Sequence, residues 1–171
     1  MKNSKSQIPN SRFFITTLLV IWLLVLGTLS CCGYSTRSLL PGYMKTVHVK
    51  LFENNTLKAG LDEIATNSVV DAFQKGSGLR LTSESNANIV IEGKVTGYSK
   101  DPYTYTSSQE VIEYRLTVTF TARCVDQVSN EVFWEGSVSD FVTFETDEDQ
   151  AISDASQKTA EKLVNTILTN W

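Results

Sequence analysis

The residues of this chain that are best suited to covalent chemistry are two adjacent cysteines, Cys31 and Cys32. Neighbouring thiols can enter a disulfide, bind a metal ion or carry a lipid, and their surroundings decide among these uses. The chain has one further cysteine, Cys124, and one histidine, His48. Three cysteines do not make a disulfide framework, and no Cys-x-x-Cys or Cys/His spacing indicates a zinc site.

An apolar segment lies directly before the two cysteines. Residues 13–29 contain no charged side chain, and Lys2, Lys5 and Arg12 precede them. A basic stretch followed by an apolar stretch and small residues is typical of a secretory signal peptide. The alternative is a retained transmembrane helix, since about 17 apolar residues is the lower limit for crossing a bilayer.

Small residues followed at once by cysteine favour a lipoprotein signal over a retained helix. In such a signal, Leu and two small residues precede a cysteine whose sulfur receives a diacylglycerol, and the amine exposed by cleavage is then acylated. Cys32 has Leu29 and Ser30 in the required places and Cys31 in the remaining one, whereas Cys31 would have Thr28 in place of Leu. We therefore predict lipidation of Cys32, with Cys31 as the alternative. Two or three acyl chains anchor a protein stably to a membrane.

The chain is expected to have three parts. Residues 1–31 are a lipoprotein signal peptide that is removed, residues 32–44 a lipidated N-terminus and tether, and residues 45–171 one folded domain. Composition is that of a globular chain, with 42% hydrophobic and 20% charged residues. Because three of the fifteen basic residues and none of the nineteen acidic ones lie before Cys32, the remainder has a net charge of −7. Nucleic acid is therefore not an expected partner.

Hydrophobic periodicity predicts the secondary structure. A period of two indicates strands, and apolar spacings of three and four residues indicate helices. The strand segments are residues 45–52, 79–82, 88–98, 112–124 and 131–144, and the helical stripes run over residues 61–73 and 152–171. We expect an α+β fold, a two-layer sandwich with two helices packed on one face of a mostly antiparallel four- to five-stranded sheet. The crossover through the first helix allows the first strand to pair in parallel.

Several local features are predicted as well. Val132 should point into the core, and Gly93 and Gly97 should share one side of their strand, where a large residue or a helix packs closely. Thr146-x-x-Asp149 resembles a capping box at the start of the last helix.

The polar residues do not indicate an enzyme. His48 lies on the polar face of its strand, so a surface position is favoured over a catalytic base or a metal ligand. Cys124 falls on an apolar face and is expected to be a small buried hydrophobe. The acidic run Asp147, Glu148 and Asp149 lacks the spacing of a calcium loop and suits the positive end of a helix dipole. We predict no catalytic residue, no metal site and no cofactor.

Residues 97–110 are predicted to form a loop rich in tyrosine. Exposed tyrosines combine apolar area with a hydroxyl, as binding surfaces often do. Equally, these side chains could simply cover the end of the sheet. Lys100 adds a positive charge suited to a phosphate or a carboxylate. Tyr98, Lys100, Tyr103 and Tyr105 are therefore candidate contacts with a partner or a lipid.

Taken in order, these pieces resemble the LPS-assembly lipoprotein LptE family over essentially the whole mature chain. The matching segments are Cys32-Gly33-Tyr34, "LFENNT" (51–56), "NANIVIEGKVTGY" (86–98), "VFWEGSVSDFVTF" (132–144) and the final helix ending in Trp171. Each segment alone is loose, and their order and spacing carry the resemblance. One departure is Ala87-Asn88, where many relatives have Ala-Asp.

The resemblance implies an outer-membrane lipoprotein, lipid-anchored, with its domain on the periplasmic side or inside a barrel lumen. It implies a non-enzymatic chain that partners and plugs the LptD β-barrel and assists insertion of lipopolysaccharide, which family members can bind. Thr117, Thr119 and Thr121 would suit a polar lumen, although ordinary solvent exposure explains them equally. The alternative is a periplasm-facing lipoprotein that regulates a cell-wall enzyme or serves as a secretion-assembly subunit.

Replacing Cys32 by Ser is expected to give an unprocessed precursor without acyl chains, because the sulfur that accepts the lipid is missing. Labelling with palmitate and the mobility of the precursor measure this, and Cys31→Ser is the control that stays lipidated. If labelling persists in Cys32→Ser and disappears in Cys31→Ser, the lipid is carried by Cys31 instead.

Overall fold

The computed structural model describes residues 42–169, so both candidate lipidation sites and the predicted signal peptide lie outside the described residues. In chain order the elements are β1 (Thr46–Val49), β2 (Glu53–Asn54), α2 (Leu61–Gly76), β3 (Arg80–Leu81), the 3-10 helix η1 (Glu84–Asn86), β4 (Ile89–Tyr105), β5 (Val111–Asp126), β6 (Glu131–Phe144) and α3 (Glu148–Thr169). Both predicted helices and the predicted β5–β6 hairpin are confirmed. Within residues 42–169, no helix has the length and apolar character needed to cross a membrane.

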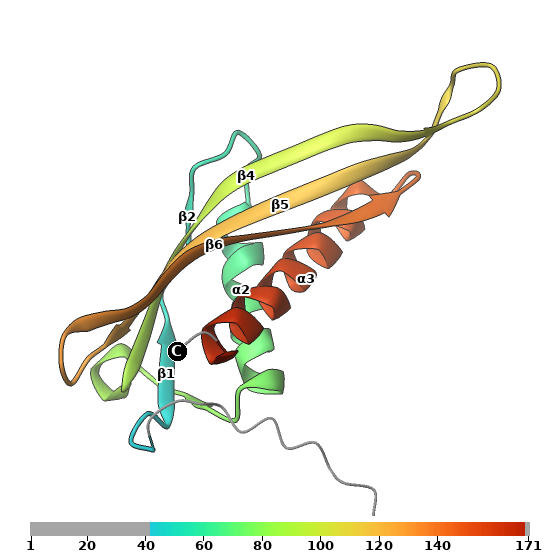
Figure 1. The fold of residues 1–171 in the computed structure, drawn as a ribbon. Helices are drawn as coiled ribbons and strands as arrows, with labels where there is room; N and C mark the ends of the chain where they lie inside the picture. Colours follow the sequence, from blue (N-terminus) through green and yellow to red (C-terminus); the bar gives the residue numbers. More distant parts are fainter. Residues whose placement is uncertain (1–41, 170–171) are drawn as a thin grey trace, which may run out of the picture. The chain divides into compact units, whose positions relative to one another are not determined.

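The strands form one mixed sheet in the order β3-β1-β4-β5-β6, and β2 also pairs with β4 (Figure 1). β1 runs parallel to both β3 and β4, and β2 runs parallel to β4. The two long ladders, β4–β5 and β5–β6, are antiparallel. The α+β sandwich is thus confirmed, and so is the parallel pairing of the first strand. The sheet differs from the prediction in having six strands in place of four to five, and in having more parallel pairings than expected. β2 escaped prediction because two residues are too few to show an alternating pattern.

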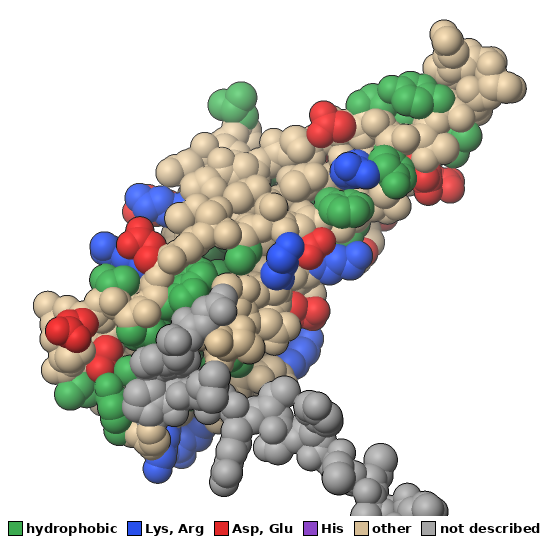
Figure 2. Space-filling model, in the orientation of Figure 1, with side chains coloured by type: hydrophobic (Ala, Val, Ile, Leu, Met, Phe, Trp, Pro, Cys, Tyr) green, Lys and Arg blue, Asp and Glu red, His purple; other side chains and the backbone are tan. Residues whose placement is uncertain are grey.

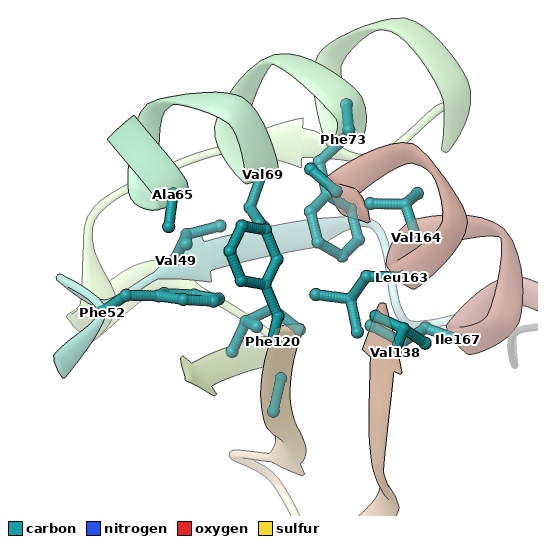
Figure 3. Packing of buried hydrophobic residues seen from close by; sticks show 14 of the residues in the cluster. Val49, Phe52, Ala65, Val69, Phe73, Phe120, Val138, Leu163, Val164 and Ile167 are labelled. Carbon is teal, nitrogen blue, oxygen red and sulfur yellow. The ribbon is translucent and has the colours of Figure 1, made fainter. Parts of the chain in front are cut away.

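Both helices pack on the same face of the sheet, and the core lies between them and the strands (Figure 1). Figure 3 shows Phe73 of α2 and Leu163 of α3 pointing toward the same space as Phe120 of β5. The rings of Phe52 and Phe120 meet edge to face, with centroids 5.7 Å apart. Each of these buried side chains contributes about 1.5–3 kcal/mol relative to an exposed position.

The aromatic ring of Phe52 lies against the backbone of β4 at Gly93. A Cβ at Gly93 would overlap this ring, so the predicted close packing is confirmed. Gly97 faces the other side, where a Cβ would lie 2.9 Å from Thr119 Oγ1. The prediction that both glycines share a side is wrong, because the register of β4 shifts between Val95 and Gly97.

A second irregularity turns Val132 outward. Cys124 pairs with Trp134, but the next residue of β5, Val125, pairs with Val132, so β6 has one extra residue at this point. Such a bulge reverses which side chains face the core. Val132 is 48% exposed, and its predicted inward position is therefore wrong.

The predicted loop over residues 97–110 is mostly strand. β4 continues to Tyr105, and the connection to β5 is closed by a hydrogen bond from the N–H of Thr106 to the carbonyl of Glu110. Gly97 and Pro102 with many Ser and Thr residues are typical of loops, which is why the strand was missed. The β4–β5 hairpin continues past α3 toward its tip (Figure 1). Residues 97–117 are called the arm below.

Asn88 joins β1 to the start of β4. Its Oδ1 accepts hydrogen bonds from the backbone N–H of Lys45 and Thr46, at 3.1 and 3.2 Å, and from the Thr46 hydroxyl at 2.8 Å. All three partners are donors, so a carboxylate oxygen would serve as well. Asp at this position would therefore preserve the contact.

Changing Gly93 to Ala is expected to destabilise the domain by about 1–3 kcal/mol, because the methyl group overlaps the buried Phe52 ring. Chemical denaturation measures the loss. Gly76→Ala is the matched control, because nothing lies within 4 Å of a Cβ there. Adding Phe52→Leu to Gly93→Ala should recover part of the loss. Unchanged stability of Gly93→Ala would contradict the close contact.

Candidate functional site

The four candidate contact residues do not form one cluster. Tyr98 pairs across the ladder with Val118 and Lys100 with Leu116, and both partners are fully buried. Residues in a cross-strand pair share a face, so Tyr98 and Lys100 lie on the helix side of the sheet. Tyr103 lies on the opposite, uncovered face.

Tyr98 and Lys100 converge on Glu148, the first residue of α3. The Tyr98 hydroxyl donates to Glu148 Oε1 at 2.9 Å, and Lys100 Nζ lies 2.6 Å from Oε2. Lys58, from the connection between β2 and α2, places its Nζ 2.9 Å from Oε1. One carboxylate therefore joins the arm, α3 and the β2–α2 connection. No local pattern indicates this cluster, because its members lie about 50 and 90 positions from Glu148.

These contacts change the acidity of the groups involved. The Lys100 ammonium, followed by Lys58 and the Tyr98 hydroxyl, lowers the pKa of Glu148 to about 2. Burial, followed by the Glu148 carboxylate, raises the pKa of Tyr98 to about 12. At neutral pH the carboxylate is ionised and the phenol is protonated, as the hydrogen bond between them requires.

Aromatic rings hold Lys100 on its other side. Its Nζ lies 4.7 Å from the ring centroid of Tyr114 and 5.3 Å from that of Phe144, which are cation–π distances. Since Lys100 is engaged by a carboxylate and two rings of its own chain, an external anion would have to displace Glu148.

The helix start that presents Glu148 is capped by the residue before it. Asp147 Oδ1 accepts the N–H of Gln150 at 3.0 Å. The predicted capping box from Thr146 is therefore wrong by one position, and α3 begins at Glu148.

On the uncovered face of the arm, Arg115 lies between two aromatic rings. Its guanidinium carbon is 4.4 Å from the ring centroid of Tyr103 on β4 and 4.6 Å from that of Phe141 on β6. These three residues are called the Arg115 stack. Both rings are about half exposed, and Tyr105 is 55% exposed further along the arm. Figure 2 shows hydrophobic side chains gathered along the arm among a few charged ones.

The rest of the uncovered face is rich in hydroxyl groups. Thr117, Thr119 and Thr121 are half-buried and alternate with core residues, as predicted for the polar face of the hairpin. The Thr121 hydroxyl lies 3.2 Å from that of Thr96 and 3.3 Å from that of Ser137, so the hydroxyls of three adjacent strands form a chain.

A hollow of about 530 Å³ lies on this face near β2 and is lined mainly by charged side chains. Five of its six charged groups are paired: Glu92 binds both Lys50 and Arg123, and Glu53 binds Lys94. The sixth, Glu135, is exposed. The three basic and three acidic side chains that line the hollow balance in formal charge.

The residues that could serve catalysis have structural positions. His48 Nδ1 lies 3.0 Å from the carbonyl oxygen of Thr82. Cys124 is fully buried, as predicted, and burial raises the pKa of its thiol. In the described part of the chain, no three His, Cys, Asp or Glu side chains are grouped closely enough to hold a metal ion.

Changing Glu148 to Gln is expected to lower the free energy of unfolding by about 1 kcal/mol at pH 7, because three donors lose an ionised acceptor. The pKa of Glu148 is lowered from 4.5 to about 2 in the fold, so its contribution is complete above about pH 4.5 and is lost as the pH falls toward 2. Denaturation of both proteins between pH 7 and pH 2.5 should show the difference shrinking in this window. Asp149→Asn, which removes a charge from the same helix turn, is the control. A difference independent of pH would contradict the ion-pair explanation.

Comparison with solved structures finds proteins of similar fold. They include the PelC dodecamer from Paraburkholderia phytofirmans, 17% identical over 73% of this chain and 89% of that chain, with a TM-score of 0.51. A hypothetical protein from Chlamydia trachomatis is 10% identical over 71% and 94% of the two chains, with a TM-score of 0.53. A protein from Xanthomonas campestris is 10% identical over 75% and 83%, with a TM-score of 0.53. At these identities the likeness concerns the fold alone.

No curated protein matches the chain by sequence. A family model does: residues 44–167 match the model described as LptE, lipopolysaccharide-assembly. The match covers nearly the whole described domain, including the sheet, both helices and the arm. The chain belongs to the LptE family of lipopolysaccharide-assembly proteins.

Proposed function

We propose that this protein is an outer-membrane lipoprotein that binds inside an LptD-like β-barrel as a plug and assists insertion of lipopolysaccharide into the outer leaflet. The lipid is carried by Cys32, and the protein has no catalytic role of its own. The observation that carries the proposal is the uncovered face of the sheet, in a chain of the LptE family.

The uncovered face has the chemistry that a barrel lumen would accept. Barrel interiors are polar, and hydroxyl groups can both donate and accept hydrogen bonds to such a wall. Threonine and serine hydroxyls cover the middle of this face, and the acidic and basic residues that line the hollow near β2 balance in number. The uncovered face is thus polar but carries little net charge near β2.

The edge of the sheet at β6 also favours a partner that contacts the face of the sheet, because backbone groups of this edge are already hydrogen-bonded to side chains. Asp140 Oδ1 accepts the N–H of Phe141 at 2.8 Å, and Lys162 Nζ donates to the carbonyl of Ser139 at 2.9 Å. An added strand needs these backbone groups, so the edge is partly blocked. A partner that uses the face does not need them.

The candidate contact residues then take two roles. We assign Tyr103 and Tyr105, which are exposed on the arm, to contacts with the barrel or with lipopolysaccharide. Tyr98 and Lys100 hold the arm against α3 through Glu148. They reach an external ligand when Glu148 is displaced.

Purification of the full-length lipidated protein from detergent-solubilised membranes should recover a large β-barrel protein with it, and depletion should reduce surface lipopolysaccharide and increase sensitivity to large antibiotics. Altered peptidoglycan with a normal outer leaflet would support the alternative, a lipoprotein that regulates a cell-wall enzyme. Consistent recovery of the protein alone would contradict a barrel plug.

A further inference from the structure

We propose that the Arg115 stack is a docking point for a carboxylate of the partner protein, on the uncovered face of the sheet. The proposal rests on the proposed function, because the partner is taken to be the barrel that encloses this face. It assigns a specific recognition role to Arg115, which forms no ion pair within residues 42–169.

Arg115 has an unsatisfied charged group. Its Nε is buried and has no hydrogen-bond partner in the described structure. Within residues 42–169, no carboxylate forms an ion pair with Arg115, whereas Arg123, on the same face of β5, binds Glu92 through Nε at 2.6 Å. A buried donor of a charged group is costly when unpaired, and no anion of residues 42–169 compensates this cost. Because Nε itself is buried, an incoming carboxylate would bind the two terminal nitrogens of the guanidinium.

The two rings prepare the guanidinium for a planar anion. Tyr103 and Phe141 come from the strands on either side of β5, so the guanidinium is flanked from both directions. Its N–H groups form a rigid fork that matches the two oxygens of a carboxylate. Because the side chain is already ordered, binding loses little conformational entropy. Aromatic residues and arginine are also enriched among the residues that contribute most to binding in protein interfaces.

The charges around Arg115 favour a protein carboxylate over the phosphates of a lipid. Asp101 lies directly opposite Arg115 in the ladder and is exposed. Glu113, two residues earlier on the same strand, accepts a hydrogen bond from Thr104 at 2.8 Å. One cation with two acidic neighbours repels a headgroup that carries several negative charges. A single carboxylate carries less charge and meets less repulsion, and the rings supply apolar contact area.

The experiment measures binding of the full-length lipidated protein to the purified barrel in detergent. Arg115→Gln is expected to weaken binding roughly tenfold or more, and Arg115→Lys to restore only part of the loss, because a point charge lacks the planar fork. Arg123→Gln is the matched control, since this arginine lies on the same strand and face but is already paired; it should bind within about threefold of the original protein. Asp101→Asn should bind as well as the original protein or more tightly.

Three results would overturn the proposal. Barrel binding by Arg115→Gln at the original affinity would show that the arginine does not dock there. Equal losses of binding and of folding stability in Arg115→Gln and Asp101→Asn would show that Asp101 is its partner. Normal barrel binding with a loss of lipopolysaccharide binding, measured on the protein alone, would assign the anion to the lipid. If the original protein recovers no barrel at all, the proposed function has failed instead.

Discussion

Leu116, Val118 and Phe120 of β5 are fully buried because α3 packs directly on this strand. One face of the sheet is apolar along its whole centre, and a domain of this kind must cover such a face with helices. A helix rises about 1.5 Å per residue and a strand about 3.3 Å. The 22 residues of α3 therefore cover about 33 Å, whereas the 17 residues of β4 reach about 55 Å. The excess strand length forms the outer part of the arm.

At the N-terminal end of α3, where the helix stops covering the sheet, polar contacts hold the arm in place of core packing. Glu148 stands at the first turn of α3, at the boundary between the covered sheet and the arm. A carboxylate there is favoured by the positive end of the helix dipole and by three donors from two other parts of the chain. On the uncovered face, no carboxylate of residues 42–169 plays this part for Arg115. The two sides of the arm thus differ: one is satisfied within the chain, and the other keeps an unpaired charge between aromatic rings.

The parts of the fold that depend on local periodicity were predictable from sequence. The helical stripe from Leu61 to Phe73 and the alternation along β5 depend on neighbours in sequence, and the structure keeps both. Val132 was not predictable, because a single extra residue in β6 reverses its side. Tyr98 and Lys100 were candidates from composition, yet their binding to Glu148 depends on how a helix approaches a strand about 50 residues away. Periodicity carries no information about such an approach.

β1, the first strand of the domain, is held firmly at its N-terminal end. β1 is held by parallel neighbours on both sides, and Asn88 clamps its first residues. Just before it, the Tyr43 hydroxyl donates to Asp126 Oδ2 at 2.7 Å, at the end of β5. These contacts join the start of the described domain to β3, β4 and the end of β5 at once, so the segment that follows residue 42 is held by three separate strands.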